Sequence, residues 1–94
     1  MKWVEIITLR STGNDLEALD IKSLVAIKDD YPAGKLEQII VYKRYAMDTD
    51  LSMHLHWNSN RVEPAGSKLA LHLMQLLKEY GLVNHSIWRE EEGY

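Results

Sequence analysis

Residues Leu51–Asn58, LSMHLHWN, decide the fold of this chain because apolar and polar side chains alternate along them without interruption. The apolar positions are Leu51, Met53, Leu55 and Trp57, and the polar positions are Ser52, His54, His56 and Asn58. A period of two is typical of a β-strand with one face in a core and the other face open. The segment therefore predicts a half-buried strand, whose apolar face other elements must cover.

Three further segments predict strands on either side of this one. Leu36–Tyr45 is rich in β-branched and aromatic residues, and the short connection 46–50 predicts a hairpin with Leu51–Asn58. Trp3–Arg10 has apolar residues on both faces, which favours a central strand of the sheet. Val83–Arg89 is predicted as the last strand.

The first of two predicted helices follows Trp3–Arg10. It begins at Asn14, whose side chain can form a capping box with Glu17 three positions later. Its apolar stripe is irregular, and we expect the helix to end near Lys28.

The second predicted helix has the clearer pattern, since apolar residues recur at helical spacing over Leu69–Tyr80. Either the Glu63-Pro64 step or Ser67 could open this helix. Gly81 directly after it is predicted to take the left-handed conformation that ends many helices, with Leu82 folded back on Leu77.

The order of elements is strand, helix, strand, strand, helix, strand. This is the ferredoxin-like α+β plan, a four-stranded antiparallel sheet with two helices on one face. We expect a single domain over residues 1–94, with an acidic tail at 90–94. Neither side of Trp3–Arg10 is polar enough to be left in water, so we expect a homodimer that packs through the open faces or edges of the sheets.

Composition narrows the classes of function. The chain has 94 residues, of which 46% are hydrophobic and 27% charged, as is typical of one globular domain. It has no cysteine, which excludes disulfides, thiolate zinc sites and cysteine nucleophiles and favours a cytoplasmic location. A net charge of −3 without a basic run predicts no nucleic-acid partner. No apolar stretch approaches the roughly 20 residues of a membrane span, so we expect no membrane partner.

His54 and His56 form the one motif with an explicit chemical mechanism. Residues i and i+2 of a strand share a face about 6.6 Å apart, so both imidazoles could converge on zinc, copper or iron. Glu5 would be the third ligand if Val4 and Ile6 face the helices, because the neighbouring strand would then place its carboxylate beside the histidines. Polar alternation on an open sheet face explains the two histidines without a metal, and we expect none.

The same face could hold a small molecule. His54 or His56 could act there as a general base or hydrogen-bond donor, and Arg44 could bind an anionic group. The catalytic candidates are His54 and His56, and the ligand-binding candidates are Glu5, Tyr42, Arg44, Trp57 and Trp88. Alternatively, Arg44 is a solvated charge at a strand end and Trp88 packs in the dimer.

Trp57-Asn58-Ser59 places an aromatic residue at the end of a strand, directly before the connection to the second helix. With the element order, this junction resembles that of the dimeric α+β-barrel superfamily, which includes antibiotic biosynthesis monooxygenase-like domains and many small uncharacterised bacterial proteins. Members that act as cofactor-independent or haem-degrading oxygenases use an asparagine near the first strand, a tryptophan on the third strand and a histidine on the second helix. The resemblance implies that Trp57 matches the tryptophan and His72 the histidine, whereas Trp3–Arg10 contains no asparagine.

Together these features predict a homodimer that binds or transforms a small molecule in a pocket at the open sheet face. Two alternatives stay open: a non-catalytic oligomerisation or interaction module, and a transition-metal-binding protein that uses His54 and His56. We expect no cofactor.

Overall fold

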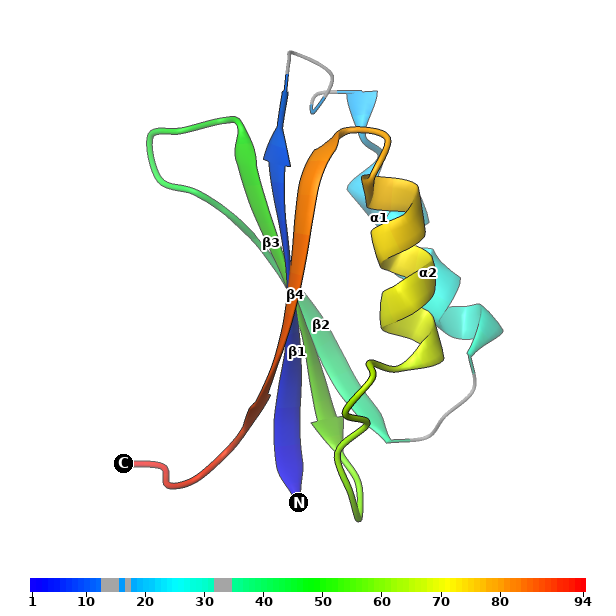
Figure 1. Ribbon diagram of the computed structural model, residues 1–94, viewed down its shortest axis with the longest axis vertical. Coiled ribbons are helices and arrows are strands. Elements are labelled where there is room, and N and C mark those ends of the chain that lie inside the picture. Colours follow the sequence, from blue (N-terminus) through cyan, green and yellow to red (C-terminus); the bar gives the residue numbers. More distant parts are fainter. Residues whose placement is uncertain (13–15, 17, 32–34) are drawn as a thin grey trace.

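A computed structural model of the chain describes residues 1–12, 16, 18–31 and 35–94. Within them, four strands form one antiparallel sheet in the order β2-β3-β1-β4, and the helices lie on one face of it (Figure 1). The elements are β1 (Lys2–Ser11), α1 (Ile21–Ala26), the 3-10 helix η2 (Ile27–Asp30), β2 (Leu36–Lys43), β3 (Asp50–Asn58), α2 (Lys68–Leu77) and β4 (Gly81–Arg89). The predicted ferredoxin-like α+β class is confirmed.

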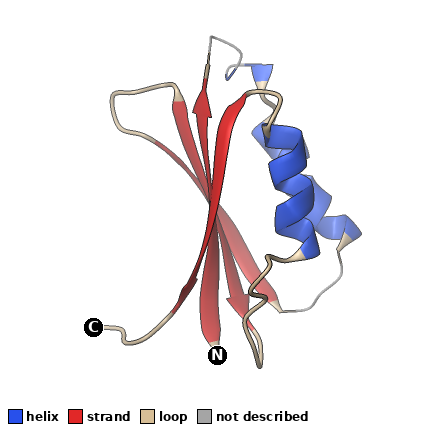
Figure 2. Cartoon of the chain, in the orientation of Figure 1, coloured by secondary structure: helices blue, strands red, loops and turns tan. Residues whose placement is uncertain are grey.

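The hydrophobic core lies between the sheet and the helices (Figure 2). Its centre comes from β1, β3 and α2, and includes Ile7, Leu9, Met53, Leu55, Leu69, Leu73 and Leu77. The antiparallel register of β1 and β3 sets Ile7 opposite Met53 and Leu9 opposite Leu51. The apolar half of the alternation in β3 therefore faces the helices.

The α-helix α1 begins at Ile21. The N-cap of α1 is Asp20, whose Oδ1 accepts a hydrogen bond of 3.2 Å from the backbone N–H of Ser23. The Ser23 hydroxyl donates a second bond of 2.7 Å to Asp20 Oδ2, and this closes the first turn of the helix. The predicted capping box of Asn14 with Glu17 lies outside the described residues.

Ser67, one of the two predicted openings, is the N-cap of α2. Its hydroxyl oxygen accepts a hydrogen bond of 3.0 Å from the backbone N–H of Ala70. The Glu63-Pro64 step belongs instead to the connection before the helix.

The predicted role of Gly81 was wrong. The C-cap of α2 is Lys78, Gly81 is the first residue of β4, and its φ is not among the positive values of the described residues. A Cβ atom at Gly81 would lie 2.1 Å from the backbone carbonyl oxygen of Arg10, so the residue is small because β1 and β4 approach closely there. Leu82, which was expected to fold back on the helix, is 65% exposed.

The other face of the sheet is uncovered in a single chain. It carries Val4, Ile6, Thr8, Arg10, Ser52, His54, His56, Tyr42, Leu82, Asn84, Ser86 and Trp88. Three large apolar side chains of this face are well exposed, namely Leu82 at 65%, Trp88 at 59% and Tyr42 at 47%. Among the helices of the described residues, none has the length and apolar character needed to cross a membrane.

Candidate functional site

Glu5 lies on the helix face of the sheet, not on the face of the histidines. In the β1–β3 pairing Glu5 is opposite Leu55, whereas Val4 is opposite His56 and Ile6 opposite His54. The condition for the three-ligand metal site is therefore not met, because Val4 and Ile6 share the histidine face. Among the residues that the structure describes, no group of three or more histidine or carboxylate side chains is placed to hold a metal ion.

The Glu5 carboxylate is fully buried and is surrounded by donors from three other parts of the chain. Oε1 accepts hydrogen bonds from the Trp57 indole N–H at 2.8 Å and from the Ser67 hydroxyl at 2.5 Å. Oε2 accepts one of 3.0 Å from the Ser67 backbone N–H and lies 2.8 Å from His85 Nε2. A buried carboxylate needs such hydrogen bonds to offset the loss of its hydration. We call Glu5, Trp57, Ser67 and His85 the Glu5 cluster.

The turn before α2 is shaped to fit this cluster. Gly66 has a φ of 92°, which is favourable for glycine, and a Cβ atom there would lie 3.0 Å from His85 Cε1. The following residue, Ser67, donates to Glu5 and at the same time caps α2. The cluster therefore fixes the start of α2 against β1, β3 and β4.

Ser67 and His85 were not predicted from the sequence as site residues. The available signal was Glu5 itself, a single acid in the series Trp3, Glu5, Ile7 and Leu9 that faces the core. An acid on a buried strand face needs donors nearby. The positions of those donors depend on tertiary contacts across 62 and 80 residues of chain.

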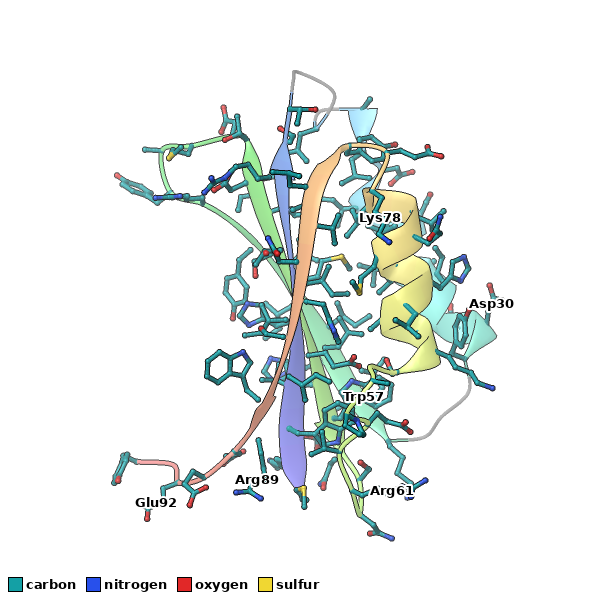
Figure 3. The ribbon with its side chains drawn as sticks, in the orientation of Figure 1. Asp30, Trp57, Arg61, Lys78, Arg89 and Glu92 are labelled. Atoms are coloured by element: carbon teal, nitrogen blue, oxygen red, sulfur yellow. The ribbon has the colours of Figure 1, made fainter. Side chains whose placement is uncertain are left out.

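A cavity of about 630 Å³ lies beside the Glu5 cluster, on the helix side of the sheet. We call it the helix-side cavity, and its lining includes Trp3, Trp57, Tyr31, Lys35, Glu63 and Lys68. Figure 3 shows Trp57 on this side of the sheet, next to the chain that leads into α2. The charged residues of the helix-side cavity are two acids and two bases, namely Asp30, Glu63, Lys35 and Lys68.

Two indole rings form one wall of the helix-side cavity. Trp3 and Trp57 stack with ring centroids 5.5 Å apart and an interplanar angle of 15°. Each indole N–H is already bonded, that of Trp3 to Ser59 Oγ at 2.8 Å and that of Trp57 to Glu5. The rings are therefore held in place by the protein and have no free donors, and only a small part of each reaches the cavity, because Trp3 is 3% and Trp57 5% exposed.

A phenol–imidazole pair lies at the same cavity. Tyr31 lines it, and the Tyr31 hydroxyl is 2.8 Å from Nδ1 of His72 on α2, with the two rings edge to face. His72 is half-buried. The histidine that the resemblance indicated on the second helix thus contacts a cavity residue through a hydrogen bond.

The predicted catalytic histidines lie on the open face. His54 Nε2 is 2.9 Å from Ser52 Oγ, and its ring centroid is 4.7 Å from that of Tyr42 and 6.4 Å from that of His56. Partial burial and, secondarily, the neighbouring His56 lower the pKa of His54, which favours the neutral imidazole. His56 Nε2 is buried and has no hydrogen-bond partner among the described residues.

The five predicted ligand-binding residues do not share one pocket. Tyr42 and Arg44 line a cavity of about 450 Å³ on the open face, whereas Trp57 lines the helix-side cavity. Trp88 is separated from His56 by Val4 of β1, and its indole N–H donates to Ser86 Oγ at 2.9 Å. The structure brings together Tyr42, His54 and His56 on one face, and Glu5 with Trp57 on the other.

Comparison with solved structures identifies the fold. A variant of SnoaB, a cofactor-independent oxygenase from Streptomyces nogalater, superposes with a TM-score of 0.69 at 11% identity, covering 98% of this chain and 95% of that one. Rv0793 from Mycobacterium tuberculosis gives 0.67 at 14% identity, covering 99% and 98%. An antibiotic biosynthesis monooxygenase gives 0.68 at 10% identity, covering 98% and 100%. No protein-family profile and no curated protein sequence matches the chain.

These neighbours are antibiotic biosynthesis monooxygenase-like domains with the ferredoxin-like α+β fold, as the resemblance in sequence implied. At 10–14% identity, the likeness shows a common fold. Any function of this chain must be argued from its own residues.

Proposed function

We propose that this protein binds a small, flat organic molecule in the helix-side cavity, against the wall formed by Trp3 and Trp57. The observation that carries the proposal is the stacked pair of indoles, held rigidly beside an open volume by bonds to Glu5 and Ser59. A volume of about 630 Å³ lies within the roughly 300–1,000 Å³ of small-molecule sites. The fold that the chain shares with monooxygenase-like domains is consistent with small-molecule binding in general.

The chemistry of the lining narrows the ligand. Both indole N–H groups are occupied, so the wall can contribute only apolar and aromatic contact. Lys35 and Lys68 are the cationic donors of the lining, and the Tyr31 hydroxyl is a further polar group, hydrogen-bonded to His72. A planar aromatic body with one or two hydroxyl or carbonyl oxygens matches both features.

This site differs from the one expected from sequence, which was a pocket at the open sheet face. The difference in the location of the site follows from the register of β1. Because Trp3 and Glu5 face the helices together with Trp57, the aromatic wall and its carboxylate support lie on the covered side of the sheet.

Isothermal titration with 2-naphthol, a planar probe with one hydroxyl, tests the proposal. In Glu63→Trp, a large side chain at an exposed lining position fills the cavity, and we expect affinity to fall at least about tenfold. The matched control is Glu79→Trp, which puts the same side chain at an exposed position just beyond α2. Equal affinities in both variants and the parent protein would place the probe elsewhere and reject the helix-side cavity as its site.

Oxygenation of the bound molecule is a second candidate function, favoured by the Tyr31–His72 pair at the cavity. Molecular oxygen reacts with a phenolic compound more readily once a base has removed its proton. The Tyr31 hydroxyl can take up this proton while it passes its own proton to Nδ1 of a neutral His72, so the imidazole is the final base. We expect oxygen uptake with polyhydroxylated naphthalenes to fall at least about tenfold in His72→Ala, with probe affinity retained. Uptake that is unchanged in His72→Ala would exclude the pair from the reaction.

Homodimerisation is proposed on separate grounds. Leu82, Trp88 and Tyr42 are exposed on the open face, and an apolar patch on a free sheet face is typical of an interface between proteins. Native mass spectrometry should give a dimer for the parent chain and a folded monomer for Trp88→Ser. A monomeric parent chain at micromolar concentration would contradict this proposal. The cytoplasmic location stays a prediction from sequence.

A further inference from the structure

The side chains of the open face form rows that run across the four strands. The middle row consists of Ile40, His54, Ile6 and Ser86. The row on one side of it consists of Tyr42, Ser52, Thr8 and Asn84, and the row on the other side of Gln38, His56, Val4 and Trp88. No residue of these three rows is an acid, a lysine or an arginine. The centre of the open face is therefore uncharged as long as His54 and His56 are neutral.

His54 has two ionisable neighbours on this face. The ring centroid of Tyr42 on β2 lies 4.7 Å from that of His54, and the ring centroid of His56 lies 6.4 Å from it. The strands β1 and β4 contribute only Ile6 and Ser86 to the same row. Partial burial and then the neighbouring His56 lower the pKa of His54, and no acid within the described residues opposes them.

The two ends of the open face differ in charge. Where β1 ends, the cavity of about 450 Å³ is lined by three bases and one acid, namely Arg10, Lys43, Arg44 and Asp50. Where β1 begins, a cavity of about 370 Å³ that also contacts His56 is lined by two acids and one base, namely Glu37, Glu90 and Lys2. Two more glutamates, at positions 91 and 92, follow in the tail. This difference favours a second copy that lies with its ends exchanged, because each basic end then faces an acidic end.

The shape of the chain leaves room for such a second copy. Figure 1 shows the β2–β3 connection and the chain beyond β4 on the side of the sheet away from the helices, at opposite ends. A second copy on the open face would lie between these two projections. Tyr45 and Met47 of the connection and Tyr94 of the tail are exposed in a single chain. With the ends exchanged, the connection of each copy reaches toward the tail of the other.

We propose that a second copy packs on the open face with its ends exchanged, about a two-fold axis along the middle row, and that this pair forms only while His54 and His56 are neutral. The inference rests on the homodimer proposed above and specifies its geometry. An axis along the middle row sets each residue of the row against its own counterpart. Facing sheets lie about 10 Å apart, so the two His54 side chains meet, with His56 of each copy one row away. Protonation would bring like charges together in a covered interface and separate the copies.

Analytical ultracentrifugation at pH 7.5 and pH 5.0 tests the role of the histidines. The dimer favours the neutral imidazoles more than the single chain does, so it should weaken as the pH falls through the pKa values of the single chain. We expect its dissociation constant to rise at least about tenfold between the two pH values. In His54→Gln/His56→Gln the rise should shrink to less than about threefold, whereas His72→Gln on α2 should retain it.

A permanent charge at the middle row gives a second test at one pH. His54→Lys should stay folded by circular dichroism, and its dissociation constant at pH 7.5 should be at least about tenfold higher than that of the parent protein. The matched control is Gln75→Lys, which adds the same charge at an exposed position on α2 and should leave the dimer unchanged. Undiminished dimer affinity in His54→Lys would overturn the proposal.

The orientation of the second copy is tested by a distance. The chain has no cysteine, so Asp48→Cys in the β2–β3 connection carries a single spin label for double electron–electron resonance. With the ends exchanged, the two labels lie more than about 30 Å apart, since the nine residues of β3 span about that length. Aligned ends would bring the labels within about 20 Å of each other and overturn the exchanged geometry.

The outcomes separate this inference from the homodimer on which it rests. A monomer at pH 7.5 would reject the homodimer itself. A dimer whose dissociation constant is the same at both pH values, or rises equally in His54→Gln/His56→Gln, would reject only the inference drawn from the histidines.

Discussion

The two faces of the sheet differ in how their buried polar groups are hydrogen-bonded. On the helix face, the fully buried carboxylate of Glu5 is met by donors from β3, β4 and the start of α2. On the open face, His56 Nε2 is buried and has no partner within the described residues. A buried polar group that is fully bonded fixes its surroundings, whereas an unbonded one destabilises them. The difference indicates that the helix face is organised before any ligand binds.

Removing Glu5 should have the largest effect, because it breaks the organisation of the helix face. In Glu5→Ala the Trp57 indole, the Ser67 N–H and His85 lose their acceptor within the core. We expect the free energy of unfolding to fall by about 3–5 kcal/mol in urea denaturation. The control is Glu37→Ala on β2, an exposed acid whose loss should change stability by less than about 0.5 kcal/mol. Equal effects of the two variants would contradict the structural role of the cluster.

Ser67→Ala should have the next largest effect, since one hydroxyl serves two elements. It donates to Glu5 and accepts from Ala70 N–H, so its loss removes a bond to a carboxylate and the cap of α2. We expect a decrease of about 2 kcal/mol in the free energy of unfolding. In a double-mutant cycle with Glu5→Ala, the double variant should lose less stability than the sum of the two single losses, because both substitutions remove the same bond. Strict additivity would show that the serine acts on the helix alone.

His56→Leu examines the open face in the same assay. Leucine removes the imidazole nitrogen that lacks a partner and keeps a side chain of similar size. We therefore expect stability to stay within about 1 kcal/mol of the parent protein, with any change toward higher stability. A loss as large as that of Glu5→Ala would mean that the two faces do not differ as described.

The smallest effect concerns the pH dependence of His54. Burial and, secondarily, the charge of His56 lower its pKa in the folded protein, so the unfolded chain binds this proton more readily. Stability should therefore fall as the pH drops through about 6.5, the ordinary pKa of histidine, and level off below the folded pKa. NMR titration should show that the pKa of His54 rises in His56→Gln. An unchanged pKa in that variant would assign the whole shift to burial.

The fold was predictable because two of its patterns are local. The alternation in Leu51–Asn58 and the apolar stripe of Leu69–Tyr80 each place a core face by themselves, and the structure keeps both. The face of Glu5 was not predictable, since Trp3–Arg10 has apolar residues at odd and even positions alike. Only pairing with β3 determines which set faces the helices.

The candidate site was predictable only in part, for a related reason. Trp57 was identified from its place at the end of a strand, and it does line a cavity. Ser67 and His85 were missed because they reach Glu5 across 62 and 80 residues of chain. Gly81 was misread for the same reason, because the backbone that crowds it belongs to β1 and not to the helix before it.

The three tryptophans of the chain report on the two faces of the sheet and give the most direct test of ligand binding at the helix-side cavity. Trp3 and Trp57 line the helix-side cavity, and Trp88 lies on the open face. In ¹H–¹⁵N spectra titrated with 2-naphthol, we expect the indole N–H signals of Trp3 and Trp57 to shift together while that of Trp88 does not. A shift confined to Trp88 would place the ligand on the open face and reject the helix-side cavity as its site.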